Sequence, residues 1–400
     1  MGSKTVKRLC IYKMRLHLPA IPHTITSPEF SHCAFTGKVL RFAPMMRSRG
    51  YEVIHYGVEG SASGGDNVDL LSREEWEQLR LESHRELYPD GAARGFVGDL
   101  ANVGTPLYRE FNRRLRIALL ERYREGDIVC LPFGEAHREA IEGLGLLAVE
   151  SGIGYPQSFL PFRIFESHAQ KAWVCGREQA PPHNYWFVVP NYYDVSEWPF
   201  GTPTKPLVGY FGRICHIKGL EVVCEVARRF PDVDFVVCGQ GEDAYTQRSP
   251  NLRYQPPLHG RDRGVFLSQL TCLLTPSVYL EPFCGVNVEA QLCGTPVIAP
   301  DAGAFAETVE HLRTGLLCHT LADYCLGVRL ALEGRFDRAY VRARALRYDM
   351  YSVALEYDYA FRCIADLRRE GWYAAESHLS TTSLPLISKS SGNCSSSAAI

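Results

Sequence analysis

Hydrophobic and polar positions follow each other along this chain in two alternating periods. Short apolar runs of the kind that form buried strands occur in both halves, for example at 127–131 and 207–211. Between such runs, apolar residues recur at helical spacing, as at 35–49 and 220–230. This alternation of strands and helices predicts parallel sheets covered by helices, which is an α/β fold.

The alternation is interrupted once near the middle of the chain. Residues 191–206 contain three prolines and little periodicity, so we predict a linker between two domains. Two doubly wound domains leave a cleft at the carboxyl ends of their strands, where such sheets bind ligands. The predicted organisation is a first Rossmann-like domain, the linker, a second Rossmann-like domain, a terminal helix and a disordered, serine-rich tail, at 1–190, 191–206, 207–350, 351–373 and 374–400.

The first half of the chain is less regular than the second. We expect its first strand within 6–18 and an irregular loop at 58–71, where Gly, Ser and Asp are frequent. A helix is expected at 135–144.

Composition narrows the class of protein. Apolar residues make up 46% of the 400 positions and charged residues 22%, as in a globular protein. The net charge of -2 and the lack of a basic tract argue against a nucleic-acid partner. Fourteen cysteines form no CxxC pair, and several lie in apolar runs, which predicts buried thiols in a reducing compartment.

No secretory pattern opens the chain, and no apolar run approaches the roughly 18 residues of a membrane helix. We therefore predict a cytoplasmic protein with no transmembrane segment, and leave peripheral membrane contact open.

The segment 276–290 has the clearest chemical content. Glu281 and Glu289 lie eight positions apart around Pro282 and Gly285, where the pattern predicts the start of a short helix. Free backbone N–H groups at such a start can face an anion. Two carboxylates beside an anion cradle suit a nucleotide sugar. The same spacing also fits one loop glutamate and one solvated helix glutamate.

Two cations and a glycine turn follow neighbouring strands of the second half. Arg213 and Lys218 come directly after the strand 207–211, where they could neutralise a diphosphate or stay solvated. The lysine precedes a glycine, so this is not a Walker loop. Gly239-Gln240-Gly241-Glu242 follows the next strand and suits a close approach of backbone to ligand, although tight turns often contain two glycines.

Together these motifs closely resemble, in their order, the nucleotide-binding domain of retaining GT-B glycosyltransferases of the GT4 type (glycosyl transferases group 1). The first half looks like the acceptor domain of that family. The resemblance covers about 5–370 and implies two Rossmann-like domains facing across a cleft. The motifs that carry it are Gly212-Arg213 with Lys218, Gly239-Gln240-Gly241-Glu242, Pro276-Ser277, Glu281 with Glu289, Gly294-Thr295-Pro296, Gly303 with Glu307, and Thr314-Gly315.

The resemblance also implies roles. Arg213 and Lys218 would bind the donor diphosphate and stabilise the leaving nucleotide, and Glu281 would contact the donor sugar. The departing diphosphate gains negative charge in the transition state, which preorganised cations and N–H groups stabilise. No metal and no cofactor besides the donor is implied. The implied donor-binding residues are Gly212, Gly241, Glu242, Phe283, Cys284, Gly285, Val286 and Glu289, the last at the ribose hydroxyls.

Three features depart from the family pattern. Cys284 stands where the family commonly has glycine. The glycine-rich turn after the first strand is replaced by 22–36, with Gly37 as the nearest glycine. Glu150 and Ser151 fill the place of a first-domain histidine; His32, His137 and His168 are other candidates for its role.

The expected function is transfer of a sugar from a UDP- or GDP-linked donor to a glycan or other hydroxyl acceptor, with retention. A glycan and a lipid-linked acceptor are both left open as partners. Two alternatives stay open. One is a GT-B protein that binds nucleotide sugar or glycan without transfer. The other is a GT-B epimerase or phosphorylase.

Overall fold

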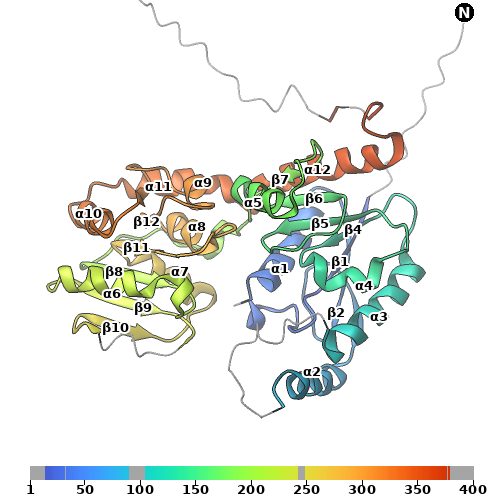
Figure 1. The fold of residues 1–400 in the computed structure, drawn as a ribbon, viewed down its shortest axis with the longest axis horizontal. Helices are drawn as coiled ribbons and strands as arrows, with labels where there is room; N and C mark the ends of the chain where they lie inside the picture. The colour runs from blue at the N-terminus through green and yellow to red at the C-terminus, as the bar shows by residue number, and fades with distance from the viewer. Residues whose placement is uncertain (1–13, 32, 90–103, 242–247, 376, 379–400) are drawn as a thin grey trace, which may run out of the picture.

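The computed structural model describes residues 14–31, 33–89, 104–241, 248–375 and 377–378. They form two separate sheets, each with helices packed on it, and the two lobes lie side by side in Figure 1. Every strand pairing between named strands is parallel. The predicted α/β architecture with two Rossmann-like domains is therefore confirmed.

The first sheet has seven strands in the order β3-β2-β1-β4-β5-β6-β7. Its central strands are buried along their whole length, because helices cover both faces of a doubly wound sheet. The strands are β1 (Arg15–Pro19), β2 (Glu52–Val58), β3 (Asp66–Leu71), β4 (Ile128–Leu131), β5 (Ala148–Ile153), β6 (Phe162–Phe165) and β7 (Phe187–Val188).

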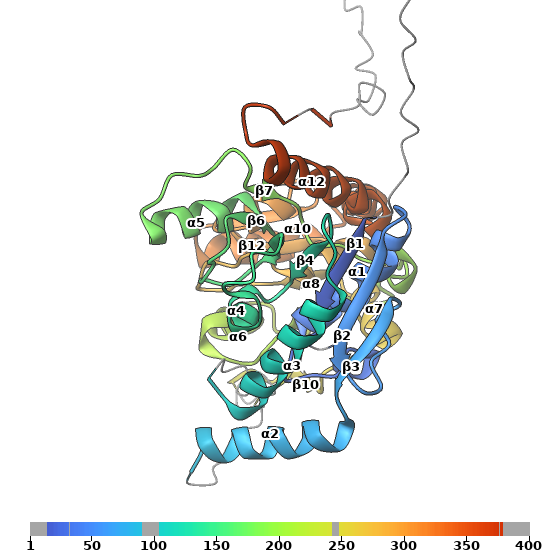
Figure 2. The same cartoon turned by 90° about the vertical axis from the view of Figure 1, so that its right-hand side faces the viewer.

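Helices cover the first sheet on two faces. One apolar cluster joins α1 and the C-terminal helix α12 to one face, and another joins α2, α3 and α4 to the other face. Figure 2 views this domain with α3 and α4 in front of the sheet. The helices are α1 (Ala34–Arg47), α2 (Arg73–Leu87), α3 (Pro106–Arg122), α4 (Arg138–Ile141), α5 (His168–Glu178) and α12 (Met350–Glu370).

The second sheet has six strands in the order β10-β9-β8-β11-β12-β13. They are β8 (Leu207–Phe211), β9 (Asp234–Cys238), β10 (Leu252–Gln255), β11 (Cys272–Leu274), β12 (Val297–Pro300) and β13 (Gly315–Cys318). The helices are α6 (Leu220–Arg229), α7 (Gly260–Ser268), α8 (Gly285–Leu292), α9 (Phe305–Thr308), α10 (Leu321–Leu332) and α11 (Arg338–Ala345).

The chain crosses between the lobes twice, at neighbouring points. Tyr193 on the outward crossing accepts a hydrogen bond from Met350 N (2.9 Å) and donates its own N–H to Tyr348 O (3.0 Å) on the return crossing. Beyond this point α12 runs across the first domain, and its Val353 and Phe361 lie in the core of that domain. The two crossings and α12 therefore tie the two sheets together.

Several predicted elements need correction. The stretch 58–71, expected to be a loop, contains the edge strand β3. The Asp and Asn residues of β3 do not follow the apolar pattern of a buried strand, because an edge strand exposes most of its positions. The helix expected at 135–144 is shorter, with a 3-10 turn at Gly134–His137 followed by α4. The sequence analysis also missed β6, because Arg163 interrupts its very short apolar run, and it missed the helix α5 that follows.

Part of the predicted first strand and most of the predicted tail lie outside the described residues. None of the helices that the structure describes is both long and apolar enough to cross a membrane.

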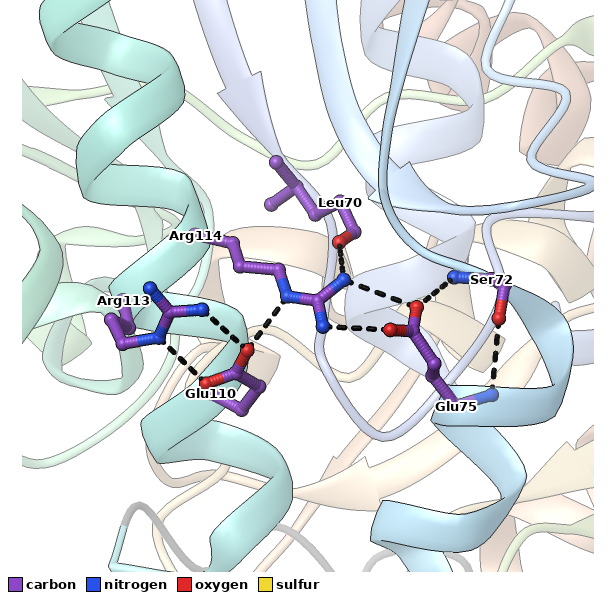
Figure 3. A network of polar contacts seen from close by, with 6 residues as sticks. All are labelled: Leu70, Ser72, Glu75, Glu110, Arg113 and Arg114. Atoms are coloured by element: carbon purple, nitrogen blue, oxygen red, sulfur yellow. Dashed lines mark hydrogen bonds and ion pairs between the residues drawn. The ribbon is translucent and has the colours of Figure 1, made fainter.

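A network of ion pairs fastens α2 to α3 at the outer side of the first domain (Figure 3). Arg114 contacts Glu75 (2.8 Å) and Glu110 (2.7 Å), and it donates to Leu70 O (2.8 Å) at the end of β3. Hydrogen bonds from Arg114 and from the Ser72 N–H hold the pKa of Glu75 down at about 2. The network stabilises the outer helices and lies apart from the carboxyl edge of the second sheet.

Candidate functional site

The candidate site begins at Glu281, in the loop between β11 and α8. Its side chain is buried, and three hydrogen-bond donors surround its carboxylate. Lys218 Nζ lies 2.5 Å and Ser277 Oγ 2.7 Å from Oε1, and Tyr279 Oη lies 2.7 Å from Oε2. A buried carboxylate is tolerated when it is paired and hydrogen-bonded in this way. The loop 275–284 is therefore folded around one charge.

Lys218 keeps its charge in this setting. Burial by itself lowers the pKa of the ammonium group, but the neighbouring Glu281 carboxylate outweighs burial, and the pKa of Lys218 is raised. Burial and the same carboxylate raise the pKa of Tyr279 to about 12, so this phenol stays protonated. The site thus presents a permanent cation at the carboxyl edge of the second sheet.

Gly219 allows the turn that carries Lys218 to pack closely against the loop 275–284. Gly219 follows Lys218 with a φ of +69°, and a Cβ on it would lie 1.8 Å from Pro276 O. Any side chain at this position would push apart the Lys218 turn and the 276–284 loop. The backbone hydrogen bond from Val278 N to Ile217 O (3.0 Å) closes the same contact.

The predicted glycine turn at 239–242 packs through Gly239 against the backbone of the turn after β8. A Cβ on Gly239 would lie 1.7 Å from Gly212 O, and Ile214 N donates to Gln240 O (2.8 Å). The turns after β8 and β9 are thereby packed on each other. Gly212 and Gly241 lie in these turns, and their contact with a donor stays a prediction.

Arg213 is exposed at the end of β8, where its backbone carbonyl accepts a hydrogen bond from Tyr210 Oη (2.5 Å). Its predicted role is compatible with this position and stays a prediction. Glu242 lies outside the described residues.

Glu289 occupies the second turn of α8 and is 8% exposed. It forms an ion pair with Arg263 of α7, whose guanidinium carbon lies 4.4 Å from the centre of the Phe211 ring. The sequence did not single out Arg263, because one cation in a mixed helix pattern looks like a solvated surface charge. A ribose at Glu289 would share its carboxylate with this arginine.

Helix α8 begins with an unusual backbone. Cys284 caps it with φ +63°, a left-handed conformation that costs a non-glycine residue on the order of 1 kcal/mol. Burial raises the pKa of its thiol well above the ordinary value, so the sulfur is not a thiolate. Cys284 thus occupies the helix start as a neutral residue in the conformation that the family's glycine would adopt freely.

The next residues place α8 against the crossing segment. A Cβ on Gly285 would lie 2.8 Å from Tyr193 Oη. Phe283 is buried, with its ring 5.7 Å from that of Tyr348, so only its backbone is available to a ligand. Val286 is half-buried at the first turn of α8.

In the first domain, Glu150 is committed to a structural role. Its carboxylate accepts from Phe159 N (3.0 Å), Leu160 N (3.1 Å) and Tyr155 Oη (3.2 Å), and it is fully buried. Burial raises its pKa to about 7. These contacts anchor the loop after β5, and Ser151 beside it is also buried.

Of the two histidine candidates among the described residues, His168 adjoins the contact between the domains, because its backbone N–H donates to Glu307 of α9 (2.9 Å). His137 is buried against Asn112 (3.1 Å), and burial lowers its pKa to about 3. His168 is exposed at the start of α5. His32 lies outside the described residues.

The two domains touch beside the loop 275–284. Ser167 Oγ donates to Pro282 O (2.6 Å), one residue after Glu281. The carboxylate of Glu307 in α9 accepts the backbone N–H groups of His168 (2.9 Å) and Ala169 (2.8 Å) at the start of α5. Figure 1 shows α5 beside the second lobe. The loop that holds Glu281 is therefore bounded by both domains.

Among the residues that the structure describes, no three His, Cys, Asp or Glu side chains gather as a metal-ion site requires. The expectation that no metal takes part stays a prediction.

Comparison with known proteins relates the second domain to a sugar-transferring family. Residues 196–345 match the family model described as Glycosyl transferases group 1. The chain is 36% identical over 130 residues to alpha-maltose-1-phosphate synthase of Mycolicibacterium smegmatis, covering 29% of this chain and 33% of that protein. It is 33% identical over 115 residues to the GDP-mannose-dependent alpha-mannosyltransferase of the same organism, covering 28% and 30%. The matches span about a third of these relatives.

Solved structures resemble the chain over most of its length. AviGT4, a glycosyltransferase involved in avilamycin A biosynthesis, superposes with a TM-score of 0.62 at 18% identity, covering 88% of this chain and 98% of that one. Anabaena HepE in complex with UDP and glucose superposes with a TM-score of 0.58 at 15% identity, covering 86% and 98%. These likenesses confirm the GT-B fold, and the family match agrees with the resemblance that the motifs indicated over 196–345.

The raised pKa of Glu150 predicts a pH-dependent stability. A carboxyl with a folded pKa near 7 and an ordinary value of 4.5 stabilises the fold below pH 4.5, and this contribution is lost as pH rises through 7. Glu150→Gln removes the titration. We expect the stability of the variant relative to wild type to rise by about 2 kcal/mol between pH 5 and pH 8 in urea unfolding.

The exposed Glu142→Gln variant is the matched control and should show no such trend. A stability difference for Glu150→Gln that is the same at both pH values would contradict the assignment.

Proposed function

We propose, from the match of residues 196–345 to the Glycosyl transferases group 1 family, that this chain is a retaining glycosyltransferase. It moves a sugar from a UDP- or GDP-linked donor to a hydroxyl of a glycan or lipid-linked acceptor. The observation that supports this most is the charged Lys218, held by buried Glu281 next to the start of α8. A cation and a helix start at one sheet edge suit a diphosphate.

Sugar transfer requires stabilisation of the leaving group, which is the nucleoside diphosphate. As the bond between the sugar and the diphosphate breaks, negative charge grows on the departing nucleotide. Lys218 is preorganised for that charge, because Glu281, Ser277 and Tyr279 fix the loop that contacts it. The exposed Arg213 can add a second cation from the end of β8. No metal or further cofactor enters the proposal.

The remaining donor contacts follow from the same placement. The first N–H groups of α8, at Gly285 and Val286, belong to the four that a helix leaves without an intrahelical acceptor. We propose that they hold phosphate oxygens, and that Glu289, oriented by Arg263, accepts the ribose hydroxyls. Both carboxylate oxygens of Glu281 already accept hydrogen bonds from the protein. We therefore propose that Glu281 orients the donor sugar and does not act as a base.

The names of related proteins support the choice of donors. One relative is named for GDP-mannose, and one structural neighbour holds UDP and glucose. Both names describe donors of the class proposed for this chain. They lend no support to the alternative of a protein that binds nucleotide sugar without transfer.

A cytoplasmic location also belongs to the proposal. All twelve cysteines within the described residues are free thiols, as expected in a reducing compartment.

A donor screen tests the proposed function. The full chain is incubated with a panel of UDP- and GDP-sugars and an acceptor extract, and products are followed by mass spectrometry. We expect one donor to be consumed with a glycosylated product of the matching mass, and an unchanged anomeric configuration by NMR. Binding without transfer would favour the non-catalytic alternative, and conversion of donor without acceptor would favour an epimerase.

The Lys218 ion pair generates a second prediction. Lys218→Met should lower kcat by about 100-fold, as loss of one preorganised transition-state donor does. It should also destabilise the fold by about 3 kcal/mol, because it leaves the buried Glu281 charge uncompensated.

The double variant Lys218→Met/Glu281→Gln separates these effects. It should recover most of the lost stability without recovering kcat. Recovery of both would show that Lys218 acts only through the fold.

A further inference from the structure

Arg41 of α1 is a cation of the first domain that faces the crossing segment. Its guanidinium carbon lies 5.3 Å from the centre of the Tyr193 ring. Its Nη2 lies 3.5 Å from the place of a Cβ on Gly37, one turn earlier, so the side chain runs back toward the helix start. The bare backbone at Gly37 leaves room for it there.

Tyr193 connects Arg41 with the start of α8 in the second domain. The Tyr193 hydroxyl reaches Gly285 at the start of α8, and the face of the same ring carries the Arg41 guanidinium. Tyr193 therefore contacts both this first-domain cation and the helix start that we propose to hold the phosphates.

Charge pairing distinguishes Arg41 from its neighbours. Lys38 pairs with Glu166, Lys218 with Glu281 and Arg263 with Glu289. Among the described residues, Arg41 has no carboxylate at ion-pair distance, and its Nε, like that of Arg263, is buried without a hydrogen-bond partner. Its charged surroundings are the like charge of Lys38 and, at longer range, the carboxylate of Glu197.

A guanidinium with an unpaired buried N–H is costly unless a ligand completes it. Its planar fork matches two oxygens of a phosphate, which a lysine or a backbone amide cannot do alone. The Arg41 guanidinium therefore suits an anion with at least two acceptor oxygens.

We propose that Arg41 is a phosphate-binding residue, contributed by the first domain to a ligand held at the start of α8. It stands one turn after Gly37, and its side chain brings donors toward the start of α1. The nature of the ligand rests on the proposed function. The phosphate comes either from the donor diphosphate or from a phosphorylated acceptor.

Calorimetric titration of the full chain in phosphate-free buffer tests this. UDP, GDP, uridine and guanosine are titrated into wild type, Arg41→Ala and Arg41→Lys. The control is Arg47→Ala, which removes an exposed cation of the same helix that donates to Gly64 O. For a donor phosphate, the Kd of the bound nucleotide should rise at least tenfold in Arg41→Ala and less in Arg41→Lys. Nucleoside affinity and Arg47→Ala should not change.

A second arm identifies an acceptor phosphate. If nucleotide affinity is unchanged in Arg41→Ala, inorganic phosphate should still raise the melting temperature of wild type and of Arg47→Ala, but not of Arg41→Ala. No effect of Arg41→Ala in either arm, or an equal effect of Arg47→Ala, overturns the proposal.

The two proposals fail separately. A wild type that binds neither UDP nor GDP refutes the proposed function, and the inorganic phosphate arm then decides on Arg41 alone. If Arg41→Ala does not fold, Arg41→Lys and Arg41→Gln replace it, since lysine keeps the charge and glutamine keeps the aliphatic stem with a polar end.

Discussion

The architecture of the site depends on one buried carboxylate. Glu281 lies at the carboxyl edge of the second sheet, and its charge must be matched there because an unpaired buried carboxylate would destabilise the domain. The donors come from two loops, with Lys218 after β8 and Ser277 and Tyr279 after β11. Matching the charge therefore fixes the position of the lysine relative to α8. The same contacts that satisfy the fold prepare a cation for a ligand.

The second constraint is the double crossing between domains. Hydrogen bonds between Tyr193 and the segment 348–350 hold the two crossings together, and α12 completes the first-domain core. This brings Arg41 to one side of Tyr193 and Gly285 to its hydroxyl. One aromatic side chain thus links the first domain to the helix start that we propose as the donor site. The contact of Ser167 with Pro282 places a second link at the loop 275–284 itself.

The sequence predicted the fold where strands are buried and turns are rich in glycine, as from 207 to 300. It failed at β3 and β6, because an exposed edge strand and a strand interrupted by Arg163 lack the apolar pattern of central strands. Within the site, it selected Lys218, Glu281 and Glu289 from their order along the chain. The sequence could not show which residues pair, since Lys218 and Glu281 lie 63 positions apart. It also could not single out Arg263, the partner of Glu289, or Arg41, because both look like ordinary helix charges. Such pairings depend on three-dimensional packing.

The central claim is that donor phosphates lie at the start of α8, and hydrogen–deuterium exchange of the full chain tests it most directly. With saturating UDP or GDP, the account predicts slower exchange of the backbone amides from 283 to 288, and little change in the outer helices α2 and α3. Unchanged exchange at 283–288, with protection confined to another part of the molecule, would contradict the account.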